Sequence, residues 1–243
     1  MTHDASLSTH CEGAVTHVVL TRETITDALV RQFHAELDAA EERKSVVITL
    51  RGTQDTFCTG ADFDSVTPVD PENLYRLWQR LAQGPFVSIC LVDGRALAGG
   101  IGFVAACDMC MATHRASFAV SELLFGLHPA CVLPFLVRKI GDHRARLLTL
   151  TTQTVGVEKA LEIGLVDAVS ENLDLDLGHH IRRIQHLDAG RVGDFKSYAA
   201  GMTQFLDLAR SEAVAENRRL FSDPQLLANI DRYKRDMKFP WET

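Results

Sequence analysis

The chain has 243 residues, of which 46% are hydrophobic and 23% charged, and its formal net charge is −7. This composition is ordinary for a soluble globular protein, and no apolar run approaches the roughly 18 to 20 residues that a transmembrane helix needs. A nucleic-acid-binding protein would normally show a basic excess or stripe, so we do not expect a nucleic acid as partner. Without a candidate membrane span we do not expect a membrane partner either, and we expect a cytoplasmic location.

The first half of the chain alternates predicted strands and helices. Residues 1–10 are polar and lack the apolar segment of a secretory signal, so we expect a short frayed tail there. Apolar residues at four-residue steps predict a helix over 24–43, and small apolar residues predict a closely packed helix over 96–106. A further helix is expected over 73–83, a loop over 52–62, and strands over 14–20, 45–50, 86–92, 108–113 and 116–120.

From Cys131 onward the pattern is mostly helical. Ser222-Asp223-Pro224 combines a capping side chain with a proline in the first turn, which is typical of a helix start. Strands mixed with helices, followed by helices alone, predict an α/β core with a helical C-terminal region. The helices expected are 131–140, 142–151 and 157–163, followed by a brief extended piece over 165–169 and then by helix.

The cysteines are spread over a mid-sized chain, which favours reduced thiols in a cytosolic setting. Cys107-Asp-Met-Cys110 has the C-x-x-C spacing of redox and zinc sites. There is no second pair, and the flanking residues are apolar, so we favour structural thiols. The six are Cys11, Cys58, Cys90, Cys107, Cys110 and Cys131.

Two glycine-containing loops are candidates for catalysis. Phe57 to Phe63 (FCTGADF) and Gly94 to Gly100 (GRALAGG) each follow a predicted strand, and the second opens a helix. Glycine lets a backbone N–H approach a ligand closely, and a helix start adds unpaired donors. Two such donors aimed at one carbonyl oxygen would form an oxyanion hole, worth roughly 3–4 kcal/mol in the transition state. The alternative is a pair of tight turns. The spacing of a dinucleotide site is absent.

Glu122 is a lone carboxylate in the otherwise apolar stretch 116–127. Removal from water raises the pKa of a carboxyl group, which suits it to proton transfer near neutral pH. The alternative is that Glu122 caps a helix or pairs with an arginine at the surface.

In this order, the segments resemble the crotonase (enoyl-CoA hydratase/isomerase) superfamily. The matching positions are Gly60-Ala61-Asp62, Gly94 to Gly100, Cys107-Asp108 and Glu122 to Pro129, and residues 157–169 are similar to a further family segment. The resemblance covers nearly the whole chain. It implies an α/β fold of the crotonase type, a spiral of ββα units with a helical C-terminal region, assembled as a homotrimer or a dimer of trimers.

The resemblance also implies domains and roles. Residues 1–190 would form the spiral core, and residues 191–243 would form a C-terminal helical region for trimerisation and cover of the active site. The N–H groups of Ala61 and Gly99 would form the oxyanion hole, and Glu122 would move protons. No metal and no cofactor is implied apart from the phosphopantetheine arm of coenzyme A or of an acyl carrier protein, which carries the substrate.

One departure from the family pattern bears on the reaction. Many hydratases of the superfamily hold a water between two glutamates, and the first of these would stand where this chain has Gly102. Only the second is present, as Glu122. Ordinary water addition by a pair of carboxylates is therefore not expected.

A narrower resemblance concerns residues 121–136, 138–141 and the ending 221–242. These are similar to the dehydratases of bacterial polyketide β-branching cassettes, the first of two crotonase homologues in each cassette. The resemblance implies removal of water from a 3-hydroxy-3-methylglutaryl group on an acyl carrier protein, which gives a 3-methylglutaconyl thioester. Glu122 would take the C2 proton and deliver it to the departing hydroxyl group.

Further residues are candidates for substrate binding. His128 could hold the distal carboxylate of the substrate, although a structural histidine is the more common case, and Arg95 is a weaker candidate. Gly100 and Cys131 are expected beside the substrate, with Cys131 packing as a small hydrophobe rather than acting as a nucleophile. Basic Arg138 and Lys139 could dock the acidic carrier protein, unless they are simply solvated charges.

Three alternative functions remain open. The first is a double-bond isomerase that works with one glutamate, and the second is a decarboxylase of the 3-methylglutaconyl thioester. The third is an inactive scaffold that only binds carrier proteins.

Overall fold

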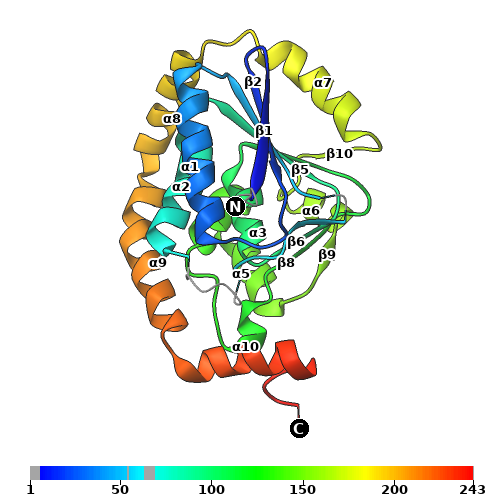
Figure 1. Cartoon of the computed structure of the whole chain (residues 1–243), viewed down its shortest axis with the longest axis vertical. Helices are drawn as coiled ribbons and strands as arrows, with labels where there is room; N and C mark the ends of the chain where they lie inside the picture. The colour runs from blue at the N-terminus through cyan, green and yellow to red at the C-terminus, as the bar shows by residue number, and fades with distance from the viewer. Residues whose placement is uncertain (1–5, 54, 63–68, 243) are drawn as a thin grey trace, which may run out of the picture.

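Three successive ββα units form the core of the computed structural model, which describes residues 6–53, 55–62 and 69–242. In each unit the first strand joins a six-stranded sheet, the second joins a four-stranded sheet, and a helix follows (Figure 1). This is the spiral that the sequence predicted. The units are β3 (Val47–Arg51), β4 (Thr56–Cys58) and α2 (Pro71–Gln83); β5 (Val87–Val92), β6 (Arg95–Leu97) and α3 (Gly99–Ala106); β7 (Met109–Ala112), β8 (Ser117–Ala119) and the 3-10 helix η1 (Glu122–Phe125).

The two sheets differ in their outer strands. The six-stranded sheet has the order β1-β2-β3-β5-β7-β10, in which β1 pairs antiparallel with β2 and all later pairs are parallel. The four-stranded sheet has the order β4-β6-β8-β9, parallel up to β8. The additional strands are β1 (Leu7–Glu12), β2 (Val15–Leu20), β9 (Val155–Gly156) and β10 (Ala168–Val169).

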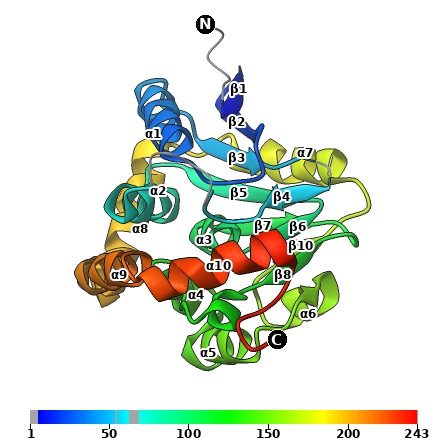
Figure 2. The same ribbon diagram turned by 60° about the horizontal axis from the view of Figure 1, so that its bottom comes forward.

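Helices cover the sheets and complete the C-terminal region. Helices α8 and α9 run along one side of the molecule, and α10 crosses its lower end (Figures 1 and 2). Asp223 caps α10 by accepting from the N–H of Gln225, which confirms the expected helix start. The remaining helices are α1 (Asp27–Glu42), α4 (Leu133–Ile140), α5 (Asp142–Thr151), α6 (Val157–Glu162), α7 (Leu173–Ile184), α8 (Ala189–Thr203), α9 (Phe205–Phe221) and α10 (Pro224–Asp236).

Aromatic side chains fill the main core between α1, α2, α3 and α4. Trp78 meets Phe103 edge-on, with ring centroids 5.9 Å apart, and meets Phe135 at 5.7 Å. A smaller apolar cluster lies on the other face of the six-stranded sheet, where Leu173 and Leu177 of α7 cover it. Both faces of the central strands are therefore buried, which explains their nearly continuous apolar sequence.

Four strands were not expected, among them the two-residue β9. The helix predicted over 96–106 begins only at Gly99, because Arg95–Leu97 forms β6. Strand β4 lies inside the expected loop over 52–62, and β1 replaces much of the expected tail. Strands of three residues are too short to display a period, and β1 is a largely exposed edge strand without an apolar alternation.

Two further expectations concern the proposed domain boundary and the end of the first glycine loop. The boundary proposed at residues 190 and 191 falls in the first turn of α8, which begins at Ala189. Phe63, the last residue of the first glycine loop, lies outside the described residues. Among the helices that the structure describes, none combines the length and the apolar character that a bilayer crossing requires.

Candidate active site

Three loops leave the same edge of the four-stranded sheet. Strands β4, β6 and β8 are parallel, with β6 in the middle, so their carboxyl ends share one edge. Ala61 follows β4, Gly99 follows β6, and Glu122 follows β8. The hydrogen bond from the Ala98 N–H to the Ala119 carbonyl, at 3.0 Å, ties the second loop to the third strand. The topology thus gathers the three predicted catalytic positions at one place.

The first two loops touch through their glycines. A Cβ atom on Gly60 would lie 2.9 Å from the Ala98 Cβ and 3.1 Å from the Gly99 nitrogen. A Cβ on Gly99 would lie 3.9 Å from the Ala61 nitrogen. Gly60 also has a φ of +97°, which side chains rarely allow. Glycine at both places is what lets the backbone nitrogens of Ala61 and Gly99 come close together.

Both of these nitrogens carry an N–H group that the fold leaves unused. The Ile25 N–H donates to the Gly60 carbonyl at 2.8 Å, and the Ile25 carbonyl accepts from the Asp62 N–H at 3.0 Å. The N–H of the intervening Ala61 therefore points away from Ile25. Gly99 is the first residue of α3, where an N–H has no acceptor within the helix. In residues 6–53, 55–62 and 69–242, neither group has a hydrogen-bond acceptor. Two free donors from separate loops are what an oxyanion hole requires.

Glu122, which follows the neighbouring strand β8, supplies a buried carboxyl group. The residue as a whole is half-buried, but its Oε2 atom is closed off from solvent and has no hydrogen-bond partner. Burial raises the pKa of Glu122 to about 7, while the N–H groups of Glu122 and Ser121 act in the opposite direction. No ion pair of Glu122 exists in the described part of the chain, so the surface-pair alternative does not apply. A carboxyl that gains and loses its proton near pH 7 is suited to acid–base work.

The place of a second carboxylate is filled by an indole ring. A Cβ atom on Gly102 would lie 2.3 Å from Cζ2 and 2.5 Å from Cε2 of Trp78. Trp78 is only 1% exposed, and its Nε1 is buried without a partner. A glutamate at position 102 has no room in this fold. The departure seen in the sequence is therefore built into the packing.

His128 is held by the C-terminal region. Its Nε2 lies 2.9 Å from Oε1 of Glu216 on α9, and Arg219 binds the same carboxylate at 2.6 Å. This contact supports the structural alternative for His128. A role in holding the distal carboxylate of a substrate stays a prediction.

Cys131 is a packed thiol. Its Sγ lies 3.6 Å from the Ala213 carbonyl of α9, and burial, followed by the nearby Glu72 carboxylate, raises its pKa to about 12. A thiol with so high a pKa is a poor nucleophile at neutral pH. Of the six cysteines, which are all free, five are buried and only Cys11 is exposed, as expected for structural thiols.

The remaining two substrate candidates lie at different ends of β6. A Cβ on Gly100 would lie 2.2 Å from the Cys58 carbonyl oxygen, so this glycine lets α3 pack directly on β4. Arg95 is exposed at the amino end of β6, and its Nη2 reaches the Thr56 hydroxyl at 3.4 Å. The structure brings Gly100 to the loop edge but does not bring Arg95 there.

Arg138 and Lys139, the predicted docking pair, make internal contacts. Lys139 forms an ion pair with Asp167 at 2.6 Å, and its side chain is 8% exposed. Arg138 donates to the carbonyls of Ala105 and Ala106 at the end of α3, where a positive charge is favourable. These contacts join α4 to the core and withdraw Lys139 from the surface, whereas Arg138 stays exposed.

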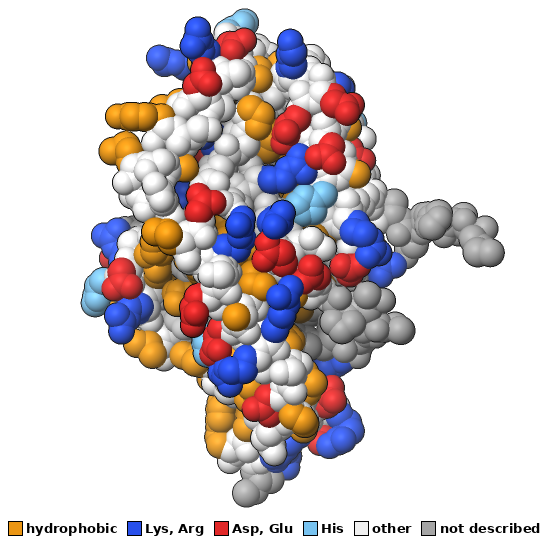
Figure 3. All heavy atoms as spheres, turned by 90° about the vertical axis from the view of Figure 1, so that its left-hand side faces the viewer, with side chains coloured by type: hydrophobic (Ala, Val, Ile, Leu, Met, Phe, Trp, Pro, Cys, Tyr) orange, Lys and Arg blue, Asp and Glu red, His pale blue; other side chains and the backbone are white. Residues whose placement is uncertain are grey.

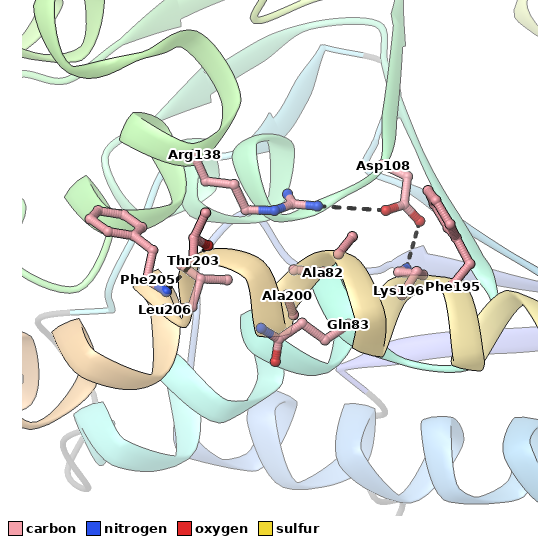
Figure 4. Close-up of a pocket in the computed structure, with 11 residues that line it drawn as sticks. Ala82, Gln83, Asp108, Arg138, Phe195, Lys196, Ala200, Thr203, Phe205 and Leu206 are labelled. Atoms are coloured by element: carbon pink, nitrogen blue, oxygen red, sulfur yellow. Dashed lines mark hydrogen bonds and ion pairs between the residues drawn. The ribbon is translucent and has the colours of Figure 1, made fainter.

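Asp108, of the Cys107-Asp108 motif, fastens the C-terminal region to the core. Its Oδ2 accepts from Lys196 Nζ of α8 at 2.7 Å (Figure 4). The same oxygen accepts from the Ser88 hydroxyl at 3.0 Å. Lys196 also donates to the carbonyls of Leu81 and Phe86. The hollow drawn in Figure 4 lies between α2, α4, α8 and α9, away from the glycine loops. The motif is therefore a structural tie.

Comparisons with known proteins agree with this geometry. The chain matches the enoyl-CoA hydratase/isomerase family over residues 11–243. It is 39% identical to the bacillaene synthase dehydratase PksH of Bacillus subtilis, covering 90% of this chain and 88% of that protein. It is 26% identical to the 2,3-dehydroadipyl-CoA hydratase of Escherichia coli, covering 88% and 85%. The crystal structure of the Bacillus subtilis polyketide biosynthesis enoyl-CoA hydratase (pksH) superposes with a TM-score of 0.92 at 36% identity, covering 97% and 99%.

Proposed function

Since the chain belongs to the enoyl-CoA hydratase/isomerase family, we propose that it dehydrates a 3-hydroxy-3-methylglutaryl thioester, carried on an acyl carrier protein, in polyketide β-branching. The product is the 3-methylglutaconyl thioester. Hydratase or dehydratase chemistry is the class that the family and the relatives share. The observation that carries the proposal is the buried carboxyl of Glu122, whose Oε2 has no partner, at the same sheet edge as two free N–H groups, in a chain 39% identical to a dehydratase.

The proposed reaction has two steps. The thioester carbonyl oxygen accepts hydrogen bonds from the Ala61 and Gly99 N–H groups, which stabilise the enolate formed when the Glu122 carboxylate removes the C2 proton. The C2–C3 double bond then forms as the C3–O bond breaks, and Glu122 gives its proton to the leaving hydroxyl group. Water leaves, and the carboxylate is restored for the next cycle. No separate cofactor takes part.

A single carboxylate suffices for this substrate because of its tertiary C3 centre. Such a centre tolerates partial positive charge, so breaking of the C3–O bond needs less help from a second acid. Trp78 occupies the space beside Gly102, where a second glutamate would stand. The packing therefore favours a reaction that one acid–base group can complete.

The carrier and the assembly are part of the proposal. Coenzyme A and a carrier protein present the same phosphopantetheine arm, and the polyketide relative favours the carrier protein. Docking of the carrier protein through Arg138 and Lys139 stays part of the proposal, with the exposed Arg138 available directly and Lys139 only after release from Asp167. We place the reaction in the cytoplasm and expect a homotrimer or a dimer of trimers.

Intact-protein mass spectrometry of a 3-hydroxy-3-methylglutaryl carrier protein tests the reaction. After incubation with the enzyme we expect the carrier to lose the mass of one water. Loss of carbon dioxide from a 3-methylglutaconyl carrier would instead indicate a decarboxylase, and a shifted double bond in a 3-enoyl thioester would indicate an isomerase. Binding of the carrier with no change in any of the three acyl groups would indicate a scaffold.

The role of Glu122 is tested by Glu122→Gln. Loss of the acid–base group lowers kcat by ~10²–10⁴-fold. The N–H groups of Ala61 and Gly99 are untouched, so the KM for the carrier-bound substrate stays near that of the parent protein. Near-normal turnover in this variant would remove Glu122 from the mechanism.

A further inference from the structure

A cluster of potential metal ligands lies on the β1–β2 hairpin, at the outer edge of the six-stranded sheet (Figure 2). His10 of β1 and His17 of β2 are direct cross-strand partners. Their rings stack with centroids 4.4 Å apart and planes 10° from parallel. Glu12 is two residues beyond His10 and so projects from the same face of the sheet. The hairpin register alone brings these three side chains together.

The spacing of the donor atoms suits a small divalent ion. One nitrogen from each histidine and one oxygen of Glu12 all lie within 4.8 Å of one another. Bond lengths of about 2.0–2.2 Å at a tetrahedral zinc ion place its donors roughly 3.3–3.5 Å apart. Because the nitrogen lone pairs lie in the ring planes, the His10 ring must turn out of its stack with His17 for both histidines to reach one ion. His10 and Glu12 are exposed and have the freedom to move.

A neighbouring strand fixes the orientation of His17. Its Nδ1 lies 2.9 Å from the hydroxyl oxygen of Thr49, which is its register partner on β3 and is 2% exposed. Histidines that bind metals commonly use the second ring nitrogen in such a hydrogen bond, which holds the ring and its tautomer. With Nδ1 engaged, Nε2 of His17 is left as the ligand atom.

The chemistry of the three donors selects the kind of ion. Two imidazoles and one carboxylate are the ligands that zinc and its neighbours prefer, whereas magnesium and calcium prefer oxygen alone.

We propose that His10, Glu12 and His17 form a binding site for a divalent transition-metal ion of the zinc type. The bound ion would link the edge strand β1 to β2. The site belongs to the six-stranded sheet, whereas Ala61, Gly99 and Glu122 belong to the loops of the four-stranded sheet. It is therefore independent of the proposed dehydration. Three protein ligands leave the fourth tetrahedral position to water.

Isothermal titration of the chelator-treated full chain with zinc chloride tests the site. We expect one ion per chain, with a dissociation constant below about 100 μM, and loss of at least ~10–100-fold in affinity in His10→Gln and in His17→Gln. Thr49→Val should weaken binding by a similar ~10–100-fold, because it removes only the support of His17. His143→Gln removes an exposed histidine of α5 and serves as the matched control, with unchanged affinity.

The outcomes separate clearly. Two results would overturn the proposal. One is binding that persists in both His10→Gln and His17→Gln. The other is the absence of one-to-one binding at about 1 mM zinc, roughly ten times the limit given above. Because His10 is exposed, its variant keeps the fold, and an unchanged thermal midpoint of the metal-free protein checks this. Magnesium chloride, titrated in parallel, should give no binding. A dehydratase assay on the metal-free protein keeps this result distinct from the proposed function.

Discussion

The carboxyl of Glu122 breaks the rule that buried polar atoms are hydrogen-bonded, since its Oε2 has no partner. Only two other buried side-chain atoms in the described residues share this property, Oγ1 of Thr9 and Nε1 of Trp78. An unsatisfied carboxylate is costly in a closed site, and the protein responds by holding the proton longer. The raised pKa of Glu122 therefore follows from the same burial that leaves Oε2 without a partner.

This residue should make stability depend on pH. Its pKa is about 7 in the folded protein, against 4.5 as the ordinary value. Between these values the folded state keeps a proton that the unfolded state has released, so stability is greatest below about pH 4.5 and falls as pH rises through 7. The full effect is about 3 kcal/mol, at 1.36 kcal/mol per pKa unit. Glu122→Gln mimics the protonated form and should lose this dependence.

Urea denaturation of both proteins at pH 5 and pH 8 measures the difference. Glu122→Gln should be the more stable by about 1 kcal/mol at pH 5 and by about 3 kcal/mol at pH 8. Parallel pH dependence in the two proteins would show that Glu122 titrates at its ordinary pKa. The variant also loses turnover, so stability and activity should change in opposite directions.

The packing at Gly102 predicts that a second glutamate cannot be restored. Gly102→Glu forces side-chain atoms into the ring of Trp78 and should lower the free energy of unfolding by about 1–3 kcal/mol or more. Gly201→Glu is the matched control, because Gly201 lies in a helix with open space around its Cβ position. The control should be neutral or slightly stabilising. Thermal melts of both variants check this, and a Gly102→Glu protein as stable as the control would contradict the observed packing.

At the scale of elements, regular helices were predictable and short strands were not. The helix predicted over 24–43 is α1 (Asp27–Glu42), and the one predicted over 73–83 is α2, because several turns display an apolar face. The strands β4 and β6 have three residues each, and no periodicity can emerge from so few. Their positions are set by pairing with strands distant in the sequence, which no local pattern contains.

The candidate site was predictable to a similar degree. The order of the motifs led to Ala61, Gly99 and Glu122, and the fold gathers these three at one sheet edge, although their roles stay predictions. Trp78 was not found, because nothing in the spacing links an aromatic residue of α2 to a glycine of α3. Lys139 was expected at the surface, since its partner Asp167 is remote in sequence. Contacts of this kind depend on tertiary packing alone.

The attachment of α8 to the core predicts a large effect for one lysine. Lys196 is 8% exposed and binds Asp108 together with two backbone carbonyls. Lys196→Met leaves these acceptors without their cation and should lower the free energy of unfolding by about 3 kcal/mol, since removing one partner of a buried pair is strongly destabilising. Arg191→Met, on the same helix, removes an exposed pair with Asp194 and should change stability by less than about 0.5 kcal/mol. Equal urea midpoints for the two variants would contradict the tie.

At the scale of the whole molecule, two apolar patches lie on different faces. The α8 patch consists of Phe195, Tyr198, Met202 and Leu208, each more than 65% exposed. Orange side chains mark this face in Figure 3, over the side of the molecule where α8 and α9 run. The α5 patch consists of Leu147 and Leu150, which are 52% and 69% exposed. Clustered apolar side chains of this kind mark interaction sites more often than free surface.

Two unlike patches on one chain suit a ring of copies. If the α8 patch of one chain covers the α5 patch of the next, each contact is head-to-tail, and a closed ring of three follows when the rotation between copies is 120°. Such a contact agrees with the expected homotrimer. A two-fold dimer would instead bury the same patch on both chains, and would leave the second patch exposed.

Charged substitutions in each patch distinguish the two arrangements. Tyr198→Glu with Met202→Glu should give a monomer, and so should Leu147→Glu with Leu150→Glu, because each pair buries charge in an apolar contact. Arg31→Met, at an exposed position of α1 outside both patches, should leave the parent assembly intact. When the two double variants are mixed, the first still has a sound α5 patch and the second a sound α8 patch, so one contact can form. Size-exclusion chromatography with light scattering should then show a dimer that contains one copy of each variant. A mixture that stays monomeric, or one double variant that assembles by itself, would rule out the head-to-tail ring.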